Sequence, residues 1–354
     1  MRISIVIPTF NRGPALATTL SALLANNPEG LDAIEIIVVD DGSTAPASAV
    51  VNTFQVAPPF ELRSVRQANA GPARARNFGF RSSHGQIVLF MDDDIISARD
   101  LVQKHTEAHR KRPGSVIFGR SLLPPPMRDT PLYKYLNSLG NDLGENAQEE
   151  FIESPLVASG HLSVERPMFA GRGTVYSENL VTPAAEEFEL SYRLRKQGVP
   201  LLLATRIVAT HDCFLDLEAV CRQQYKYGLG CGEVWEKCPE TRQFCQLRRI
   251  VDPSGDRSFR RSMLQMRRLL NASAHSRLLF LRAAQLLEAC APIPGILSLV
   301  YRATLGLHFS CGIQDGLKRF SKDSASALGQ HAGKLNLSEK TLARIRPKTR
   351  GDMT

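Results

Sequence analysis

Three consecutive aspartates, Asp92, Asp93 and Asp94, follow the apolar run 86–91, which has the composition of a buried strand. Adjacent carboxylates repel one another and need a cation to neutralise them. Hard divalent ions such as Mg²⁺ or Mn²⁺ take oxygen ligands and bind through one or two carboxylates plus the phosphates of a substrate. A solvated acidic turn has the same composition, so the triplet indicates a metal and diphosphate site only together with its surroundings.

A second apolar run, 33–39, also stops at acidic residues, Asp40 and Asp41. An aspartate at such a strand end can hydrogen-bond the base or ribose of a nucleotide. Aspartate is equally common as a cap of helices and turns. Both interpretations stay open, and one aspartate can cap while the other binds.

The first predicted strand, 2–7, ends at Pro8, Thr9 and Phe10. An aromatic ring at that place could stack on a base, although an ordinary core phenylalanine is nearly as common. Arg76 belongs to a predicted helix over 71–83, where its guanidinium could face phosphates. A basic residue on a surface helix is the alternative.

Glu186 and Glu187 open a predicted helix, 183–197. A carboxylate can act as general base on an acceptor hydroxyl, and neighbouring carboxylates raise its pKa into a useful range. Acidic residues at a helix start are also favoured by the helix dipole. His211 follows the apolar run 207–209, and imidazole is a frequent metal ligand, although a lone histidine is more often structural.

Strands and helices alternate through the N-terminal part of the chain, which predicts an α/β fold with a doubly wound, mostly parallel sheet flanked by helices. Ligands of such sheets bind outside the carboxyl ends of the strands. The polar segments 9–11, 40–43 and 92–94 each come directly after a strand. We therefore expect them to lie together at one edge of the sheet.

The charge is unevenly placed along the 354 residues: 241–350 hold 20 Lys and Arg against 6 Asp and Glu, and the remainder holds 24 against 29. A basic, helix-patterned region is typical of contact with an anionic membrane surface or an anionic acceptor, and equally of a solvated basic face. No nucleic-acid motif accompanies the charge, so no nucleic acid is expected. We expect a catalytic domain over 1–230, a mainly helical C-terminal extension over 231–325 and a polar tail over 326–354.

The cysteine pattern and the opening residues bear on the compartment. The seven cysteines form no CxxC pair, and the chain opens on a strand-like run in place of a signal peptide. We expect a cytoplasmic protein, which basic apolar helices could hold on the inner face of the membrane. No run of 18 apolar residues is present, and the nearest candidate, 291–307, is interrupted by prolines and Arg302.

Taken together, these motifs resemble those of the family 2 glycosyltransferases, which have the GT-A fold. The matching segments are IVIPTFNR at 5–12, IIVVDDGS at 36–43, NAGPARARNFGF at 69–80, IVLFMDDDI at 87–95 and AEEFELSYRLRKQG at 185–198. Their order and spacing fit over about residues 1–230, and several motifs in register are far more specific than any one alone.

The resemblance implies an inverting transfer from a nucleoside-diphosphate sugar, usually a UDP-sugar, to a hydroxyl of a glycan, a lipid-linked molecule or another acceptor. It also implies a divalent metal, Mn²⁺ or Mg²⁺. The residues carried over are Pro8, Thr9, Phe10, Asp40, Asp41, Arg76, Asp92 and Asp93 for the nucleotide, Asp92, Asp94 and His211 for the metal, and Glu187 with Glu186 for catalysis, Glu187 being the base.

Two departures from the family pattern stand out. The usual Glu-Asp pair is Glu186-Glu187 here, and the segment 183–185 replaces the more usual glycine before it. The Gln-x-x-Arg-Trp motif and membrane spans of processive synthases are missing, so we expect one sugar per encounter, in synthesis of cell-envelope glycans, polysaccharides or glycolipids. A non-catalytic nucleotide-sugar binder stays open, and a sugar nucleotidyltransferase is disfavoured because no Gly-rich loop follows the first strand.

Overall fold

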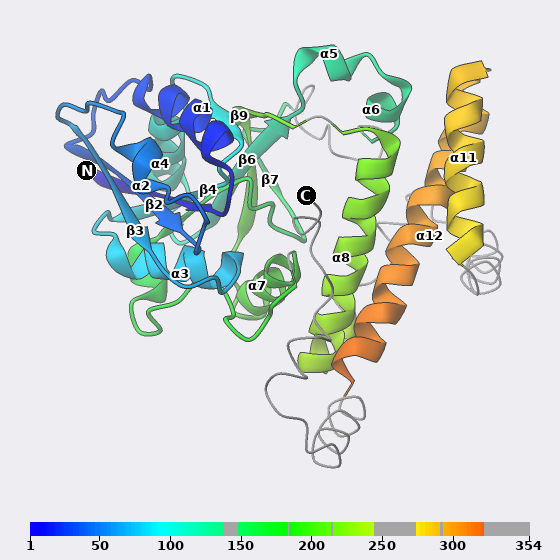
Figure 1. Ribbon diagram of the computed structural model, residues 1–354. Coiled ribbons are helices and arrows are strands. Elements are labelled where there is room, and N and C mark those ends of the chain that lie inside the picture. Colours follow the sequence, from blue (N-terminus) through cyan, green and yellow to red (C-terminus); the bar gives the residue numbers. More distant parts are fainter. Residues whose placement is uncertain (137–147, 183, 214, 244–273, 291–292, 322–354) are drawn as a thin grey trace, which may run out of the picture.

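The computed structural model describes residues 1–136, 148–182, 184–213, 215–243, 274–290 and 293–321. A nine-stranded sheet forms the centre of the N-terminal part (Figure 1). Its strands are β1 (Arg2–Thr9), β2 (Ala33–Asp40), β3 (Phe60–Arg66), β4 (Ile87–Met91), β5 (Ile95–Ser97), β6 (Val116–Leu122), β7 (Phe151–Glu153), β8 (His161–Glu165) and β9 (Leu201–His211).

The strand order is β3-β2-β1-β4-β8-β6-β9-β5, with β7 beside β9. Strands β3, β2, β1 and β4 are parallel, as are β6 and β9, whereas β8 runs antiparallel to both of its neighbours, β4 and β6. Strands β1, β2 and β4 are buried on both faces, which accounts for their nearly continuous apolar sequence, whereas the edge strand β3 is only partly buried.

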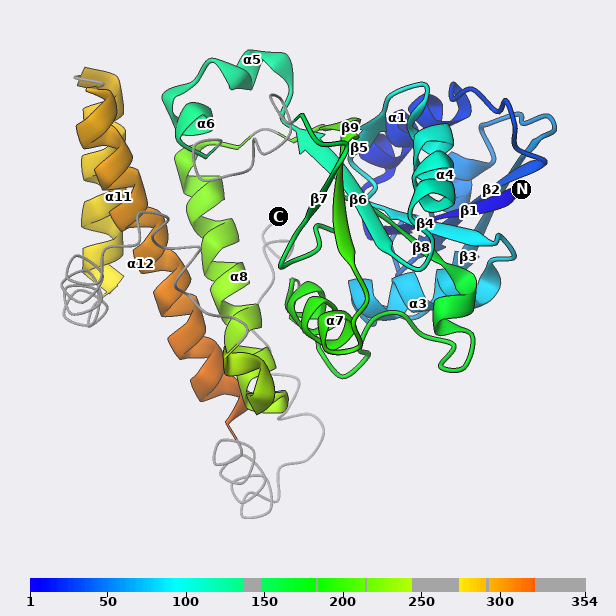
Figure 2. The ribbon, with the colours of Figure 1, turned by 180° about the vertical axis from the view of Figure 1, so that it is seen from behind.

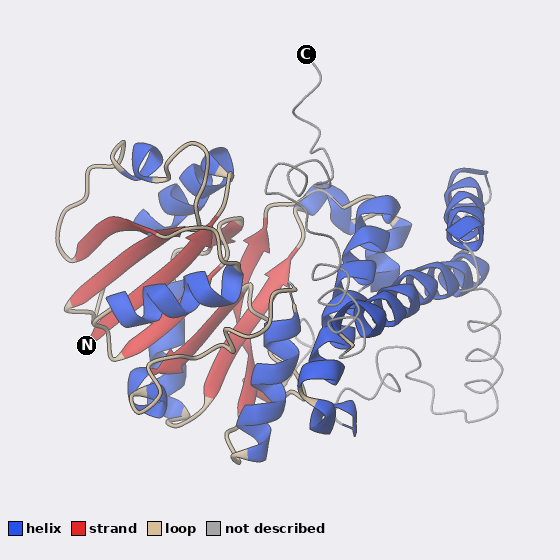
Figure 3. Ribbon diagram, turned by 60° about the horizontal axis from the view of Figure 1, so that its bottom comes forward, coloured by secondary structure: helices blue, strands red, loops and turns tan. Residues whose placement is uncertain are grey.

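Helices cover both faces of the sheet, as the alternating pattern predicts (Figure 3). On one face lie α1 (Gly13–Leu24) and the short α2 (Ser48–Val51), which share a core with the alternate apolar residues of β1 and β2, and α4 (Leu101–Lys111), which packs on β6 and β9. The other face carries α3 (Pro72–Ser82) and α7 (Ala185–Lys196). The expected α/β class with a mostly parallel sheet is therefore confirmed.

Two local details differ from the sequence pattern. The apolar segments 200–203 and 207–209, which are separated by a stretch containing polar residues, form the single strand β9, because a register irregularity in its pairing with β6 lets it continue across residues 204–207. The segment that begins with three prolines at 124–126 contains two short helices, α5 (Pro125–Arg128) and α6 (Pro131–Leu136), and β7 follows further along the chain. A short 3₁₀ turn, η2 (Arg166–Phe169), follows β8.

Three long helices make up the C-terminal part: α8 (Leu217–Lys237), α11 (Ala274–Cys290) and α12 (Pro294–Phe320), with the 3₁₀ turn η3 (Pro239–Gln243) after α8. They stand beside the edge of the sheet that lies farthest from β3 (Figure 1). The expected helical C-terminal extension is confirmed, whereas the expected tail over 326–354 lies outside the described residues.

Four glycines let α8 and α12 approach backbone to backbone. A Cβ added to Gly228 would lie 2.0 Å from the carbonyl oxygen of Phe309, and one added to Gly312 would lie 2.1 Å from that of Tyr225. Gly232 and Gly316 make the same kind of contact one turn further along each helix. The pairing therefore depends on missing side chains, and it fixes α12 against the helix that leads out of the sheet.

One helix of the described part, Gly295–Phe320, is long and apolar enough to cross a membrane, but 61% of its apolar window is buried inside the protein. That burial is what a core helix of a folded domain also shows.

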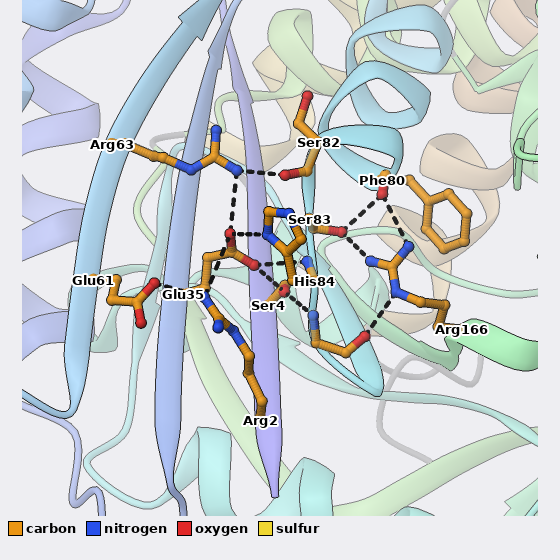
Figure 4. Close-up of polar contacts among 11 residues, drawn as sticks. Arg2, Ser4, Glu35, Glu61, Arg63, Phe80, Ser82, Ser83, His84 and Arg166 are labelled. Atoms are coloured by element: carbon orange, nitrogen blue, oxygen red, sulfur yellow. Dashed lines mark hydrogen bonds and ion pairs between the residues drawn. The ribbon is translucent and has the colours of Figure 1, made fainter.

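A polar network closes the amino ends of the first strands, at the opposite end from the predicted site (Figure 4). Glu35 on β2 accepts hydrogen bonds from Ser4 at 2.5 Å and from the backbone N–H of His84 at 2.9 Å, and it pairs with Arg63 at 3.1 Å. Burial acts to raise the pKa of Glu35, but the hydrogen bonds from Ser4 and His84 outweigh it and lower the pKa to about 2. The network ties β1, β2 and β3 to the end of α3.

A buried histidine cluster, His105 and His109 on α4 with His161 on β8, lies behind the sheet (Figure 2 shows α4 on this face). The ring nitrogens of His105 and His161 are 3.1 Å apart, and Ser163 bridges His105 and His109 at 2.8 Å each. Burial lowers the pKa of all three imidazoles, that of His161 to about 4. The cluster is therefore neutral when the protein is folded at neutral pH.

Candidate active site

The carboxyl ends of β1, β2 and β4 bring the polar segments together at one edge of the sheet. β1 lies between β2 and β4, and its last residue, Thr9, is in register with Asp40 at the end of β2. The Thr9 hydroxyl donates a 2.7 Å hydrogen bond to Asp93, which follows β4. Residues that are 84 positions apart in the sequence are thus in direct contact.

Arg12 neutralises two of the three aspartates. Its guanidinium lies 3.0 Å from Asp93 Oδ1 and 2.7 Å from Asp94 Oδ2. Asp93 and Asp94 are both buried, whereas the Arg12 side chain is 46% exposed. Burial raises the pKa of Asp93 to about 6, against the hydrogen bond from Thr9. A half-exposed cation therefore covers a buried pair of carboxylates.

His211, the last residue of β9, faces the same carboxylate. Its Nε2 is 3.2 Å from Asp94 Oδ2, and β5 brings the two together because it pairs Ile95 with His211. Burial alone would lower the pKa of His211, but the hydrogen bond and charge of Asp94 raise it to about 10. Burial would raise the pKa of Asp94, which His211 and Arg12 instead lower to about 2.

Asp94 and His211 fit a divalent cation, since Asp94 Oδ2 lies 3.2 Å from His211 Nε2 and 2.7 Å from the Arg12 guanidinium, and a bound cation would replace the imidazole proton and the guanidinium as the charge that neutralises Asp94. Within the described residues no three His, Cys, Asp or Glu side chains form a complete metal-binding group. The third predicted ligand, Asp92, instead holds Arg76 at 2.7 Å. A metal here would need oxygen atoms from a substrate to complete its coordination.

Arg76 links the end of β4 to the start of α7. Its guanidinium lies 2.7 Å from Asp92 and 3.0 Å from Glu186, and it stacks over the Tyr176 ring at 5.3 Å. The side chain is buried, and its Nε has no hydrogen-bond partner. Arg76 therefore forms ion pairs with Asp92 and Glu186, and its contact with phosphates stays a prediction.

Glu187 has a different environment from Glu186, although both are in the first turn of α7. Glu186 is buried against Arg76, whereas Glu187 is only partly buried and accepts hydrogen bonds from the backbone N–H and the hydroxyl of Ser159. Burial and the neighbouring charge of Glu186 raise the pKa of Glu187 to about 7. Of the two, Glu187 is the carboxylate able to exchange a proton near neutral pH.

The carboxylates of Asp40 and Asp41, at the end of β2, both accept hydrogen bonds from groups of the protein itself. Asp40 accepts from the backbone N–H groups of Ser43 at 2.7 Å and Ala47 at 3.0 Å, and it pairs with Arg66 at 3.1 Å. The carboxylate of Asp41 accepts from the N–H groups of residues 70 and 71, which precede α3. The capping interpretation therefore describes Asp40, and a base contact from either residue stays a prediction.

The loop after β1 presents Phe10 to solvent. Its side chain is 46% exposed, which does not fit a core phenylalanine and leaves the ring available to stack, and Pro8 before it is partly buried. Asn11 has a positive φ of 56° and accepts from the N–H of Thr44 at 2.8 Å. Asn11 thus joins the two strand-end loops.

Ala184, just before α7, has a φ of 71°. This left-handed conformation is strained for a residue with a Cβ and is where glycine is usual. Where the sequence departs from the family's glycine, the chain therefore takes a backbone conformation that glycine would adopt without strain.

Three residues with no assigned role in the sequence pattern lie near the predicted site residues: Arg12, Ser159 and Tyr227 on α8. Burial, together with the charges of Glu187 and Asp92, raises the pKa of Tyr227. Arg12 belongs to the motif at 5–12, so its position could have suggested a role. Ser159 and Tyr227 belong to no matched motif and become visible only through the fold.

Comparison with known proteins agrees with this geometry. Residues 4–149 match the model of Glycosyl transferase family 2. An uncharacterized glycosyltransferase of Bacillus subtilis (strain 168), YfnE, is 34% identical over 119 residues, which are 34% of this chain and 30% of that protein. Validoxylamine A glucosyltransferase of Streptomyces hygroscopicus subsp. jinggangensis is 33% identical over 120 residues, which are 33% of this chain and 28% of its own length. The matched part thus spans less than a third of either relative.

Among solved structures, the mannosyltransferase PcManGT from Pyrobaculum calidifontis, in complex with GDP-Man and Mn²⁺, aligns with a TM-score of 0.58 and 15% identity, over 88% of this chain and 86% of that one. At that identity the likeness concerns the fold, which is of the GT-A glycosyltransferase class. The N-terminal part of the chain is therefore similar to family 2 glycosyltransferases, and the fold is that of the GT-A class.

Proposed function

We propose that this protein is an inverting glycosyltransferase that moves a single sugar from a nucleoside-diphosphate sugar, most simply a UDP-sugar, to an acceptor hydroxyl. The observation that carries the proposal is the meeting of Glu187, Asp92, Asp94 and His211 around the carboxyl ends of the strands. The solved mannosyltransferase of the same fold holds GDP-Man and Mn²⁺, which supports a donor of this class and a divalent metal.

In this proposal each polar residue has one task. Glu187 takes the proton from the acceptor hydroxyl, and its pKa of about 7 suits that exchange. Arg76 holds Asp92 and Glu186 in place, and Phe10 stacks on the base. A divalent ion held by Asp94 and His211 would stabilise the negative charge of the departing diphosphate.

The acceptor oxygen attacks the anomeric carbon on the side opposite the diphosphate. The bond to the new oxygen forms as the bond to the diphosphate oxygen breaks, so that the configuration inverts. We place the acceptor among the glycans and lipid-linked molecules of cell-envelope synthesis and the reaction in the cytoplasm. None of the cysteines in the described part forms a disulfide, which suits a reducing compartment.

The test is release of nucleoside diphosphate from a panel of UDP-, GDP- and dTDP-sugars with Mn²⁺ present. We expect the protein to release nucleoside diphosphate from the sugars of one nucleotide class, and an Asp94→Ala variant to release none. Turnover of no donor together with tight nucleotide binding would indicate a non-catalytic binder and would contradict the proposal.

A further inference from the structure

The outer face of α11 is apolar and has no protein partner among the described residues. Six of the nine large hydrophobic side chains that the described part exposes lie within 22 residues on α11 and the start of α12: Leu278, Leu279, Leu286, Ile293, Ile296 and Leu299. Their exposed fractions run from 49% for Ile296 to 69% for Leu279. Large exposed side chains concentrated in this way mark an interaction surface.

The helical spacing puts the exposed residues of α11 on one stripe. The residues of this stripe are Leu278, Leu279, Arg282, Ala283, Leu286, Ala289 and Cys290. The opposite side of α11 is also apolar, but there Leu281 and Ala284 are buried against Leu297 and Tyr301 of α12. Two sides of the helix therefore carry apolar side chains, although only one of them is covered.

The position of α11 leaves this stripe facing away from the catalytic part. Figures 1 and 2 both show α11 as the outermost helix, on the side of α12 that is away from the sheet. Helix α12 cannot turn its glycine face outward, because Gly312 and Gly316 contact the backbone of α8. The surface that remains belongs to α11 and the first turns of α12.

The charge of this part of the chain favours an anionic occupant. Arg282 is exposed in the middle of the apolar stripe and is its one charged residue. In sequence, the segments that flank the described pair of helices, 244–273 and 322–354, hold 14 Lys and Arg against 5 Asp and Glu. Exposed leucines beside basic residues suit a bilayer that offers acyl chains and anionic headgroups together.

We propose that the α11–α12 surface docks this protein on an anionic lipid bilayer, with the helices lying in the interface and not crossing it. The docking does not depend on the transferase reaction, because the residues of the surface are separate from the carboxylates at the sheet edge. It would bring the enzyme to acceptors that are themselves held in the membrane.

The experiment is co-sedimentation of the full-length protein with vesicles of phosphatidylglycerol and phosphatidylcholine, compared with phosphatidylcholine alone. We expect binding to the anionic vesicles only. The double variant Leu279→Gln, Leu286→Gln should lower the partition coefficient about tenfold or more, because two exposed leucines lose their insertion. Arg282→Gln should lower it about fivefold, the equivalent of about 1 kcal/mol for one basic residue at an anionic surface.

Val181→Gln is the matched control, since Val181 is 57% exposed but lies between η2 and α7 in the catalytic part. It should leave vesicle binding unchanged, and all variants should keep donor turnover in lipid-free buffer. Without lipid, melting curves report the stability of each variant, and sedimentation equilibrium reports its oligomeric state.

Each of the following outcomes would overturn the proposal. Absence of binding to anionic vesicles, or equal binding by the double variant, removes the surface from membrane contact. A protein dimer that the double variant abolishes, without lipid binding, would make a second copy the occupant. A lowered melting temperature with unchanged vesicle binding would show that the chain itself covers the leucines.

Discussion

Replacing Glu187 by glutamine should stop catalysis and at the same time stabilise the protein at alkaline pH. The variant retains the shape and the contact with Ser159 but cannot accept a proton. Loss of a general base costs about 10²- to 10⁴-fold in rate. Because the working form of Glu187 is the carboxylate, the wild-type rate should rise with pH through about 7 and then level off.

The effect on stability follows from the same pKa. The pKa of Glu187 is raised from 4.5 to about 7 by burial and the charge of Glu186. Ionisation of Glu187 therefore disfavours the folded state. Its contribution to the free energy of unfolding is fully present below about pH 4.5 and is lost as the pH rises through about 7. A shift of this size corresponds to about 3 kcal/mol, which partial exposure reduces to about 2 kcal/mol.

The assay measures transfer rates from pH 5.5 to 8.5 and melting curves at pH 5 and pH 8, both for the wild type and for Glu187→Gln. We expect the variant to lose its transfer activity, to keep donor affinity and to melt a few degrees higher than the wild type at pH 8. Glu189→Gln is the matched control on α7, since Glu189 pairs with Arg193 at 2.7 Å and should affect only stability. Near-normal transfer by Glu187→Gln, or a pH profile unchanged by the substitution, would refute the assignment of the base.

Three further predictions concern other parts of the molecule. Arg12→Met removes the positive charge next to the buried aspartates and should tighten the binding of Mn²⁺ alone by about tenfold, as measured by calorimetry. Unchanged or weaker binding would show that Arg12 does not compete with the metal for these carboxylates. Burial lowers the pKa of His161 to about 4, so below about pH 6.5 the unfolded chain binds a proton that the folded protein does not. The free energy of unfolding should therefore fall by about 3 kcal/mol as the pH is lowered from 6.5 towards 4. A melting temperature that is constant from pH 7 to pH 5 would contradict this. Gly228→Ala places a Cβ 2.0 Å from a backbone oxygen of α12 and should cost about 3 kcal/mol in urea unfolding, whereas Gly295→Ala, with nothing within 4 Å, should cost nothing.

The centre of the sheet was predictable from the sequence because β1, β2 and β4 are buried on both faces. Each reads as an apolar run that stops at a polar residue, as the run 33–39 stops at Asp40. A buried parallel strand can be recognised from its local composition alone. Because the carboxyl ends of parallel strands lie at one edge of the sheet, the segments 40–43 and 92–94 that follow them are expected to lie together. Strand β9 was harder to predict, since a register irregularity within it interrupts the pattern without ending the strand.

The side-chain partners within the site were not predictable in the same way. Arg76 could have faced phosphates or solvent, and only the placement of α3 and α7 on the same face of the sheet gives it Asp92 and Glu186. Glu187 gains Ser159 from a loop that matches no motif. The glycine contact between α8 and α12 also escapes a composition argument, because small residues carry no signal until two helices are paired. Such contacts depend on long-range packing and not on local pattern.

The central claim is that a nucleoside diphosphate and a divalent metal bind together at the carboxyl ends of β1, β2 and β4. Calorimetric titration of UDP, GDP and dTDP, each with Mn²⁺ and with EDTA, tests it most directly. We expect tight binding of one nucleotide with Mn²⁺, at least tenfold weaker binding in EDTA, and loss of the metal dependence in Asp94→Ala. Absence of binding by all three nucleotides in a folded sample, or binding equal with Mn²⁺ and with EDTA, would contradict the account.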